Sequence, residues 1–312
     1  MDALIQSLVQ SNFAPDRIVP QASMAQYTTL RIGGPADVLV NVVSADEIAV
    51  ALHAAKNAGA PVTIIGNGSN LLVRDGGIRG LVLRVAGGMN AIQREGDRLI
   101  VEAGASLASV AAFARDEGLC GLAELGGIPG TVGGGVLMNA GAYGAELSQV
   151  VAQVEGIHLA DGRRVSYPAD RLNFSYRHSA LMDTDVVVTQ ATLALAPGDP
   201  EAIRARMEAC ARARREKQPL NLPSAGSTFK RPEGHFAAKL IDDCGLRGLT
   251  VGGAQVSEKH AGFVVNVGGA TARDMLELMR QIEQRVFEQT GVQLEPEVRI
   301  LGADEQKKEE SV

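Results

Sequence analysis

The chain has 312 residues, of which 46% are hydrophobic and 21% charged, a composition that suits a globular protein with room for two or three domains. Its net charge of −6 argues against a nucleic-acid-binding protein, which normally presents a basic face. The three cysteines are widely spaced and no Cys/His pair has zinc spacing, so we expect neither disulfides nor a metal site. No long apolar stretch and no basic segment near residue 1 is present, so we expect a cytoplasmic protein without a membrane span or secretory signal.

The first half of the chain alternates helical and strand-like patterns. Leu4, Ile5 and Leu8 follow helical spacing and predict a short amphipathic helix over residues 2–11. Ser44 and Glu47 form a capping box that predicts a helix to Ala58, and Ser106 caps a further helix to Glu117. Apolar runs predict strands at residues 38–43, 61–66, 80–85 and 98–104.

The second half begins with a hairpin around residues 160–162 (Ala-Asp-Gly) and a strand at 186–196. Pro200 opens a helix that ends before Pro219 and carries many arginines. This basic face is either a solvated surface or one whose C-terminal end reaches a ligand phosphate. After a linker at residues 219–226, we expect helices near 237–244 and after Thr271, with strands at 263–268 and 298–301.

Two glycine-rich stretches are candidates for holding a phosphate. Residues 127–144 read GIPGTVGGGVLMNAGAYG and contain seven glycines, while residues 66–70 read GNGSN directly after a predicted strand. Bare backbone lets a phosphate approach successive N–H groups. A mobile glycine loop and a plain left-handed turn are the respective alternatives. Together the two stretches suit a dinucleotide, although neither has the G-x-G-x-x-G fingerprint or a P-loop pattern.

Other polar stretches could carry chemistry. Ser224 and Ser227 flank a glycine in PSAGSTFKRP, where each is either a turn former or a reactive hydroxyl. Arg177 follows Tyr176 in NFSYRHS. Glu295 and Glu297 lie two apart on an expected strand and would share one face, unless they are surface acids paired with basic residues.

The ordered set of motifs resembles one family, the flavoprotein UDP-N-acetylenolpyruvoylglucosamine reductase (MurB) of peptidoglycan synthesis, from about Tyr27 to Gly302. The motifs that carry the resemblance are TLRIGGPAD, IGNGSNLLVRDGGIRGLVLR, GIPGTVGGGVLMNAGAYG, SYRHS, SAGSTFKRP, LIDDCGLRGLTVGGAQVSEKHAGFVVN and EPEVRILG. The segment HSALMDTD after Arg177 has no room for the longer insert of some members, so the chain looks like the short-loop (type II) form.

The resemblance implies an α+β fold with a two-subdomain FAD-binding part of the vanillyl-alcohol oxidase (PCMH) type and a C-terminal α+β substrate-binding domain. We expect five segments: an N-terminal helical segment (1–22), FAD-binding subdomains (23–87 and 88–222), the substrate-binding domain (223–302) and a disordered tail (303–312). It further implies FAD and NADPH as cofactors, no metal, and no nucleic-acid or membrane partner. We expect a monomer, because no exposed apolar stripe stands out.

The resemblance also implies roles for individual residues. The catalytic residues would be Ser227 as proton donor, Arg177 and Glu297. The FAD-binding residues would be Gly66, Asn67, Gly68, Ser69, Asn70, Leu71, Gly127, Ile128, Pro129, Gly130, Gly133, Gly134, Asn139, Gly141 and Ala142. The substrate-binding residues would be Tyr143, Lys217, Lys259 and Asn266.

The implied reaction is the NADPH-dependent, FAD-mediated reduction of UDP-N-acetylglucosamine enolpyruvate to UDP-N-acetylmuramate. Hydride from reduced FAD would reach the enolpyruvyl group, and Ser227 would then protonate the product carbon. Arg177 would stabilise the charge that develops on the substrate carboxylate. The alternatives are an FAD-dependent oxidase or dehydrogenase of a small alcohol or hydroxy acid on the same fold, and a non-catalytic nucleotide-binding regulator.

Overall fold

The computed structural model describes residues 1–305, which form two compact units. The first unit contains Met1–Pro20, Val38–Asn67 and Gly80–Arg214. The second unit contains Gln21–Asp37, Gly68–Arg79 and the described residues from Arg215 to Glu305. The chain therefore passes between the units several times, and one of these passages lies inside the GNGSN loop.

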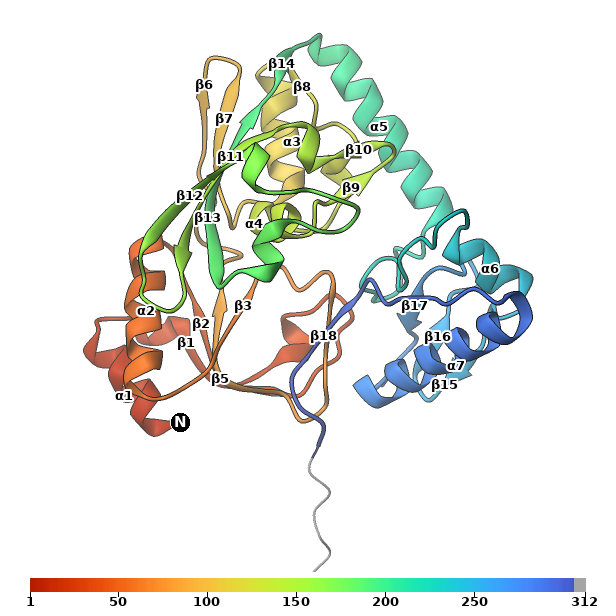
Figure 1. The fold of residues 1–312 in the computed structure, drawn as a ribbon, viewed down its shortest axis with the longest axis horizontal. Coiled ribbons are helices and arrows are strands. Elements are labelled where there is room, and N and C mark those ends of the chain that lie inside the picture. Colours follow the sequence, from red (N-terminus) through yellow and green to blue (C-terminus); the bar gives the residue numbers. More distant parts are fainter. Residues whose placement is uncertain (306–312) are drawn as a thin grey trace, which may run out of the picture. The chain divides into compact units, whose positions relative to one another are not determined.

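A five-stranded antiparallel sheet dominates the first unit (Figure 1). Its strand order is β12-β11-β13-β7-β6. The strands are β6 (Ile92–Glu95), β7 (Arg98–Glu102), β11 (Val151–His158), β12 (Arg164–Pro168) and β13 (Val186–Ala194). The predicted hairpin is confirmed, because β11 and β12 pair in antiparallel register on either side of residues 160–162.

A four-stranded sheet has the order β1-β2-β5-β3 and includes a parallel pair, β3 with β5. Its strands are β1 (Ile18–Ser23), β2 (Pro35–Asn41), β3 (Val62–Ile65) and β5 (Ile78–Arg84). Helix α2 (Ala45–Asn57) begins at Ser44, whose side chain accepts the Glu47 N–H as predicted. Helix α1 (Asp2–Gln10) packs against α2.

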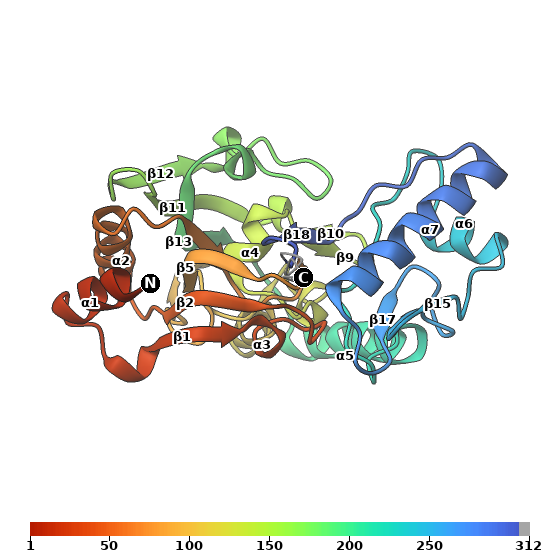
Figure 2. The same ribbon diagram turned by 90° about the horizontal axis from the view of Figure 1, so that it is seen from below.

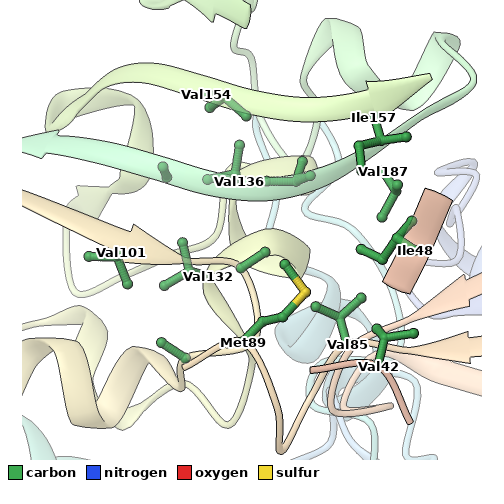
Figure 3. Packing of buried hydrophobic residues seen from close by; sticks show 14 of the residues in the cluster. Val42, Ile48, Val85, Met89, Val101, Val132, Val136, Val154, Ile157 and Val187 are labelled. Atoms are coloured by element: carbon green, nitrogen blue, oxygen red, sulfur yellow. The ribbon is translucent and has the colours of Figure 1, made fainter. Parts of the chain in front are cut away.

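Buried aliphatic side chains join the elements of the first unit into one core. Val42 and Ile48 come from the β2–α2 region, Val101 from β7, and Val154 from β11, and all are fully buried. Figure 3 shows these side chains in one cluster with Met89 and with Val132 and Val136 of the short helix α4 (Val132–Leu137). The glycine-rich region is thus built directly on the core.

The remaining elements of the first unit surround this core. They include α3 (Leu107–Asp116), which Ser106 caps as predicted, and most of α5 (Pro200–Lys217). Short strands pair as β8 (Leu119–Cys120) with β14 (Ala196–Pro197) and β9 (Gly141–Ala142) with β10 (Ala145–Glu146). The 3-10 helices are η1 (Pro15–Arg17), η3 (Leu125–Gly127), η4 (Leu147–Gln149), η5 (Ala169–Arg171) and η6 (Ala180–Asp183).

In the second unit, helix α7 packs on α6 and on an antiparallel sheet of order β15-β16-β17 (Figure 2). These elements are α6 (Ala237–Asp243), β15 (Thr250–Val251), β16 (Ala254–Val256), β17 (Val264–Asn266) and α7 (Ala272–Thr290). Strand β4 (Leu71–Val73) pairs in parallel with β18 (Arg299–Leu301), and η2 (Met24–Gln26) precedes the loop to β2. The predicted Thr271–Asp274 capping box is present.

The start of α7 is tied to a distant loop by Asp75. Its carboxylate accepts the N–H groups of Ala272 (2.8 Å) and Arg273 (3.0 Å), two of the donors that a helix leaves free at its N-terminus. A negative charge there is also favoured by the helix dipole. Asp75 therefore links the RDGG motif to the long helix of the second unit.

Gly34 is required by the same loop, because a β-carbon there would overlap the Asp75 carbonyl and lie 2.7 Å from the Gly77 nitrogen. We expect Gly34→Ala to lower the free energy of unfolding by about 3 kcal/mol, measured by urea denaturation. Gly134→Ala is the control, because its β-carbon would meet nothing closer than Thr131 Oγ1 at 3.5 Å and should leave stability unchanged or higher. An unchanged Gly34→Ala midpoint would contradict this account.

No helix within residues 1–305 combines the length and apolarity that a membrane span needs. Most of the expected disordered tail, residues 306–312, lies outside the described residues. The five expected segments remain a prediction.

Candidate active site

The three adjacent glycines of the glycine run lie in a helix rather than in a loop. Gly133, Gly134 and Gly135 form the middle of α4, which Thr131 caps by accepting the Gly134 N–H (3.4 Å). A β-carbon at Gly135 would lie 2.8 Å from Leu147, and one at Gly133 would lie 3.0 Å from Ala103. These two glycines therefore allow close packing, whereas Gly134 is exposed and has room for a ligand.

The first residues of the GNGSN loop are held against the segment just before α4. The Asn67 side chain donates to the Pro129 carbonyl (3.0 Å), and a β-carbon at Gly66 would lie 2.5 Å from Thr131 Oγ1. The two glycine-rich stretches predicted to act together thus meet within the first unit. Any larger residue at Gly66 would push them apart.

Backbone donors are free along the GNGSN loop. No acceptor among the described residues takes the N–H groups of residues 67 to 70, and Gly68 has a left-handed φ of 64°. Successive N–H groups around a left-handed residue form an anion-binding nest. The loop is therefore suited to hold a phosphate by its main chain.

Arg177 lies on a strained turn next to the end of the glycine run. Its φ is 55°, and Tyr143 on the neighbouring loop has a φ of 53°, a conformation that bulky residues rarely adopt. The Arg177 guanidinium donates to the Gly141 carbonyl (3.1 Å) and lies 5.0 Å from the centre of the Tyr176 ring. Strain of this kind is retained where surrounding contacts enforce it, and it is common at functional sites.

Asn139 supplies the contacts that enforce this geometry. Its buried amide donates to Glu146 and to the Ser175 carbonyl, both at 3.0 Å, and its oxygen accepts the Ser148 N–H at 2.9 Å. Ser179 is also buried and donates to the Leu137 carbonyl (2.8 Å). The turn that carries Arg177 is therefore held at two points, by the last residue of α4 and by Asn139 just after this helix.

In the second unit, the segment around Ser227 is held by its neighbour Thr228. The Thr228 N–H donates to Gly262, its hydroxyl accepts the Val264 N–H, and its carbonyl accepts the Glu297 N–H (2.8 Å). Ser227 is exposed, and its hydroxyl has no hydrogen-bond partner among the described residues. The chain therefore fixes the backbone of Ser227 and leaves its hydroxyl available.

Comparison with known proteins covers nearly the whole chain. Residues 218–301 match the family described as UDP-N-acetylenolpyruvoylglucosamine reductase, C-terminal domain, and residues 36–167 match an FAD binding domain family. The UDP-N-acetylenolpyruvoylglucosamine reductase of Pediococcus pentosaceus is 47% identical over 96% of this chain and 100% of its own. The chain belongs to the UDP-N-acetylenolpyruvoylglucosamine reductase family.

Two further relatives support the same family membership. The UDP-N-acetylenolpyruvoylglucosamine reductase of Clostridium novyi is 45% identical over 96% of this chain and 97% of its own. The crystal structure of the MurB reductase from Thermus caldophilus is 39% identical and superposes with a TM-score of 0.78, covering 91% of this chain and 98% of that one. The predicted α+β architecture, an FAD-binding part followed by the C-terminal domain of this reductase family, is thereby confirmed.

FAD fits the residues present in this member of the reductase family. The free N–H groups of the GNGSN loop suit a diphosphate, and Gly66 leaves no space for a side chain where that loop meets the glycine run. Gly127, Pro129 and Gly134 are exposed, so their backbone is open to a ligand. The individual contacts of the predicted cofactor-binding residues stay a prediction. Both N–H groups of the Asn139 amide already donate to groups within the chain.

The expected strand through Glu295 and Glu297 was wrong, because β18 begins only at Arg299. Pro296 forms an isolated bridge with Phe229 between the two acids, and a proline cannot donate to a regular ladder. Glu295 is paired with Lys230 (3.2 Å), one of the alternatives that the sequence left open. Glu297 is half-buried, and its carbonyl accepts the Asn70 amide (3.0 Å). Asn70 therefore ties the GNGSN loop to the segment of Glu297.

The four predicted substrate-binding residues have different surroundings. Tyr143 and Lys217 are exposed, and Lys217 makes no hydrogen bond or ion pair within the described residues. Lys259 donates to the Arg215 carbonyl (2.6 Å) near the end of α5. Asn266 is buried, donates to Leu30 (3.1 Å) and accepts from Gly268 and Ala270, so its amide organises the turn after β17.

Sequence reasoning missed Thr131 and Ser179. Thr131 starts α4 and contacts the position of Gly66, and Ser179 anchors the Arg177 turn. A threonine before a helix is a recognisable N-cap, but the following glycines concealed the helix. Nothing in the sequence indicates the partner of Ser179.

Proposed function

We propose that this chain catalyses the NADPH-dependent reduction of UDP-N-acetylglucosamine enolpyruvate to UDP-N-acetylmuramate, with FAD as cofactor. The observation that carries the proposal is 47% identity, over 96% of the chain, with a reductase named for this substrate. Written in the reverse direction, the activity is that of a UDP-N-acetylmuramate dehydrogenase with NADP⁺ as acceptor. The enzyme works in peptidoglycan precursor synthesis, and we place it in the cytoplasm as a monomer.

When bound, FAD would supply the hydride-transfer chemistry between NADPH and the enolpyruvyl group. The main chain of residues 67–70 would hold its diphosphate by the N–H groups that lack acceptors within the described chain. The exposed backbone of Gly127 and Gly134 would be open to the same ligand. These roles use glycine because a side chain would keep the ligand away from the backbone.

Arg177 binds the substrate carboxylate. As hydride adds to the terminal carbon of the enolpyruvyl group, negative charge moves into this carboxylate, and a fixed cation beside it lowers the barrier. Arg177 is suited to this task because Gly141, Asn139 and Ser179 hold its turn in place before substrate arrives. A preformed cation needs no reorganisation at the moment of reaction.

Ser227 donates the proton that completes the product, and Glu297 assists it. Thr228 fixes the backbone next to Ser227 by two hydrogen bonds. Its N–H donates to the Gly262 carbonyl, and its own carbonyl accepts the Glu297 N–H. A free hydroxyl is a weak acid, so its use requires a strongly basic carbon and a nearby donor for the alkoxide. Glu297 in its protonated form would be such a donor.

NADPH and substrate both have to reach the same flavin ring, so we expect them to use one site in turn. Initial rates of NADPH oxidation, measured at several concentrations of UDP-N-acetylglucosamine enolpyruvate, should give parallel double-reciprocal lines and substrate inhibition. The product should be identified as UDP-N-acetylmuramate by mass spectrometry. Failure to oxidise NADPH with this substrate would overturn the proposed function, and intersecting lines would overturn the shared site.

A further inference from the structure

An aromatic ring is exposed at the start of helix α6, a position that favours polar residues. Phe236 is the N-cap of α6, and its side chain makes no capping hydrogen bond. Ser, Thr, Asp and Asn are preferred at an N-cap because their side chains accept a free N–H of the helix. Phe236 is 59% exposed, the largest exposed fraction among the large hydrophobic residues that the structure describes. Neither capping nor core packing therefore accounts for a phenylalanine at this position.

The Phe236 ring is held in place although it is exposed. The Cζ atom of Arg231 lies 4.0 Å from the centre of the ring, a distance at which the guanidinium is attracted to the aromatic face. The backbone is fixed on either side of the ring. The His235 N–H donates to the Pro232 carbonyl (3.1 Å), and the Phe236 carbonyl accepts the Leu240 N–H (3.0 Å). A flat apolar surface is thus presented to solvent in a defined orientation.

This ring belongs to the same segment of the second unit as Ser227. Only four residues separate Ser227 from Arg231, and such a stretch spans at most about 14 Å. The Lys230 N–H, within this stretch, donates to the Glu295 carbonyl (2.8 Å) and fixes the connecting backbone. A ligand that reacts at Ser227 and has a length of this order can therefore also contact the Phe236 ring.

We propose that Phe236, backed by Arg231, is a stacking platform for the nucleobase of the ligand that reacts beside Ser227. The inference rests on the proposed function, because that function supplies the ligand. In UDP-N-acetylglucosamine enolpyruvate a diphosphate and a sugar separate the uracil from the enolpyruvyl group. An exposed aromatic ring binds a base through its π-face and tolerates different bases. The adenine of NADPH, which we expect to use the same site in turn, suits the same ring.

The chain contains no tryptophan, so a tryptophan at the platform is a specific reporter. Phe236→Trp in the FAD-loaded chain keeps a flat ring and adds the only indole fluorescence of the protein. Uridine 5′-diphosphate should quench this fluorescence to saturation, because the uracil stacks on the indole. Val50→Trp is the control, since it places the indole at an exposed position of α2 in the first unit, where no quenching is expected.

A second nucleotide, adenosine 2′,5′-bisphosphate, distinguishes the two sources of the base. Quenching of Phe236→Trp by both nucleotides would support a platform that substrate and NADPH share. Quenching by uridine 5′-diphosphate alone would support a platform that serves the substrate only. Quenching by the adenosine compound alone would contradict the proposal, because NADPH does not react beside Ser227.

Phe236→Leu tests the same role by kinetics. It removes the aromatic face and keeps an apolar side chain, so the Michaelis constant for UDP-N-acetylglucosamine enolpyruvate should rise about five- to hundredfold. The turnover number should stay the same, because a stack remote from the reacting carbon stabilises substrate and transition state alike. Phe236→Tyr should behave as the wild type does. Phe287→Leu is the control, since it removes an equally exposed ring (51%) from the last turn of α7.

Two results would overturn the platform: Phe236→Trp fluorescence that uridine 5′-diphosphate does not quench, or an unchanged Michaelis constant in Phe236→Leu. Both variants should fold, because the side chain is exposed, and circular dichroism checks this. A wild-type chain that does not oxidise NADPH with the enolpyruvyl substrate would overturn the proposed function instead. The failure of the platform is therefore distinguishable from the failure of the proposed function.

Discussion

Ser227→Ala should lower the turnover number by about 10²–10⁴ while leaving the reduction of bound FAD by NADPH unchanged. The variant loses the proton donor but keeps every backbone contact of Thr228, which fixes the segment through Gly262 and Glu297. The two half-reactions separate the effect, because the proton is needed only after hydride has reached the substrate. Stopped-flow absorbance of the flavin measures each half-reaction in turn.

Ser224→Ala is the matched control for Ser227→Ala. Ser224 lies in the same loop, and its carbonyl, rather than its hydroxyl, accepts the Thr29 hydroxyl (2.7 Å). Removing its side chain should therefore leave both half-reactions at the wild-type rate. Normal turnover by Ser227→Ala would show that another group delivers the proton.

Arg177→Met should lower the turnover number by about 10²–10³, because a preorganised cation is lost where charge develops on the substrate carboxylate. Methionine keeps an unbranched apolar stem and has the same energetic cost as arginine in the left-handed backbone conformation of this position. Stability should therefore change little, while the turnover number falls more than substrate affinity. Steady-state kinetics with UDP-N-acetylglucosamine enolpyruvate measures this division.

Arg171→Met serves as the control for lost positive charge. Arg171 ends η5 in the same unit and is exposed. Its loss should change neither kinetic constant. If Arg177→Met raised the Michaelis constant and left the turnover number intact, Arg177 would contribute uniform binding of substrate and transition state.

Elements with local start and stop signals were predictable from the sequence. Ser44, Ser106 and Thr271 cap helices where expected, and the turn at residues 160–162 joins two paired strands. Each signal acts between residues close in the chain, so it can be recognised without knowledge of the fold. The motifs that identified the family are likewise short stretches of sequence, so they too could be recognised without knowledge of the fold.

Features that depend on distant residues were not predictable. The helix inside the glycine run forms although glycine disfavours helices, because Gly133 and Gly135 permit close contact with Ala103 and Leu147. The short strand β4 forms because β18, from the far end of the chain, supplies its partner. Tertiary packing thus outweighs local propensity at these points.

The site was predictable in its residue types and less so in their surroundings. Glycine loops and the motifs of Arg177 and Ser227 pointed to the chemistry, whereas the anchoring of Arg177 by Asn139 and Ser179 did not. Asn139 and Asn266 remain predicted ligand contacts, and the structure adds that their buried amides bind the chain itself, which the sequence did not indicate. A sequence shows which groups are present, while only the fold shows which of them remain free.

The flavin spectrum under anaerobic conditions tests the central claim most directly. The purified chain, loaded with FAD, is titrated with NADPH and then with UDP-N-acetylglucosamine enolpyruvate while the absorbance near ~450 nm is followed. The account predicts bleaching by NADPH and full recovery when the substrate is added. Bleaching without recovery would contradict the assigned substrate, and a chain that takes up no FAD would contradict the entire account of the glycine run.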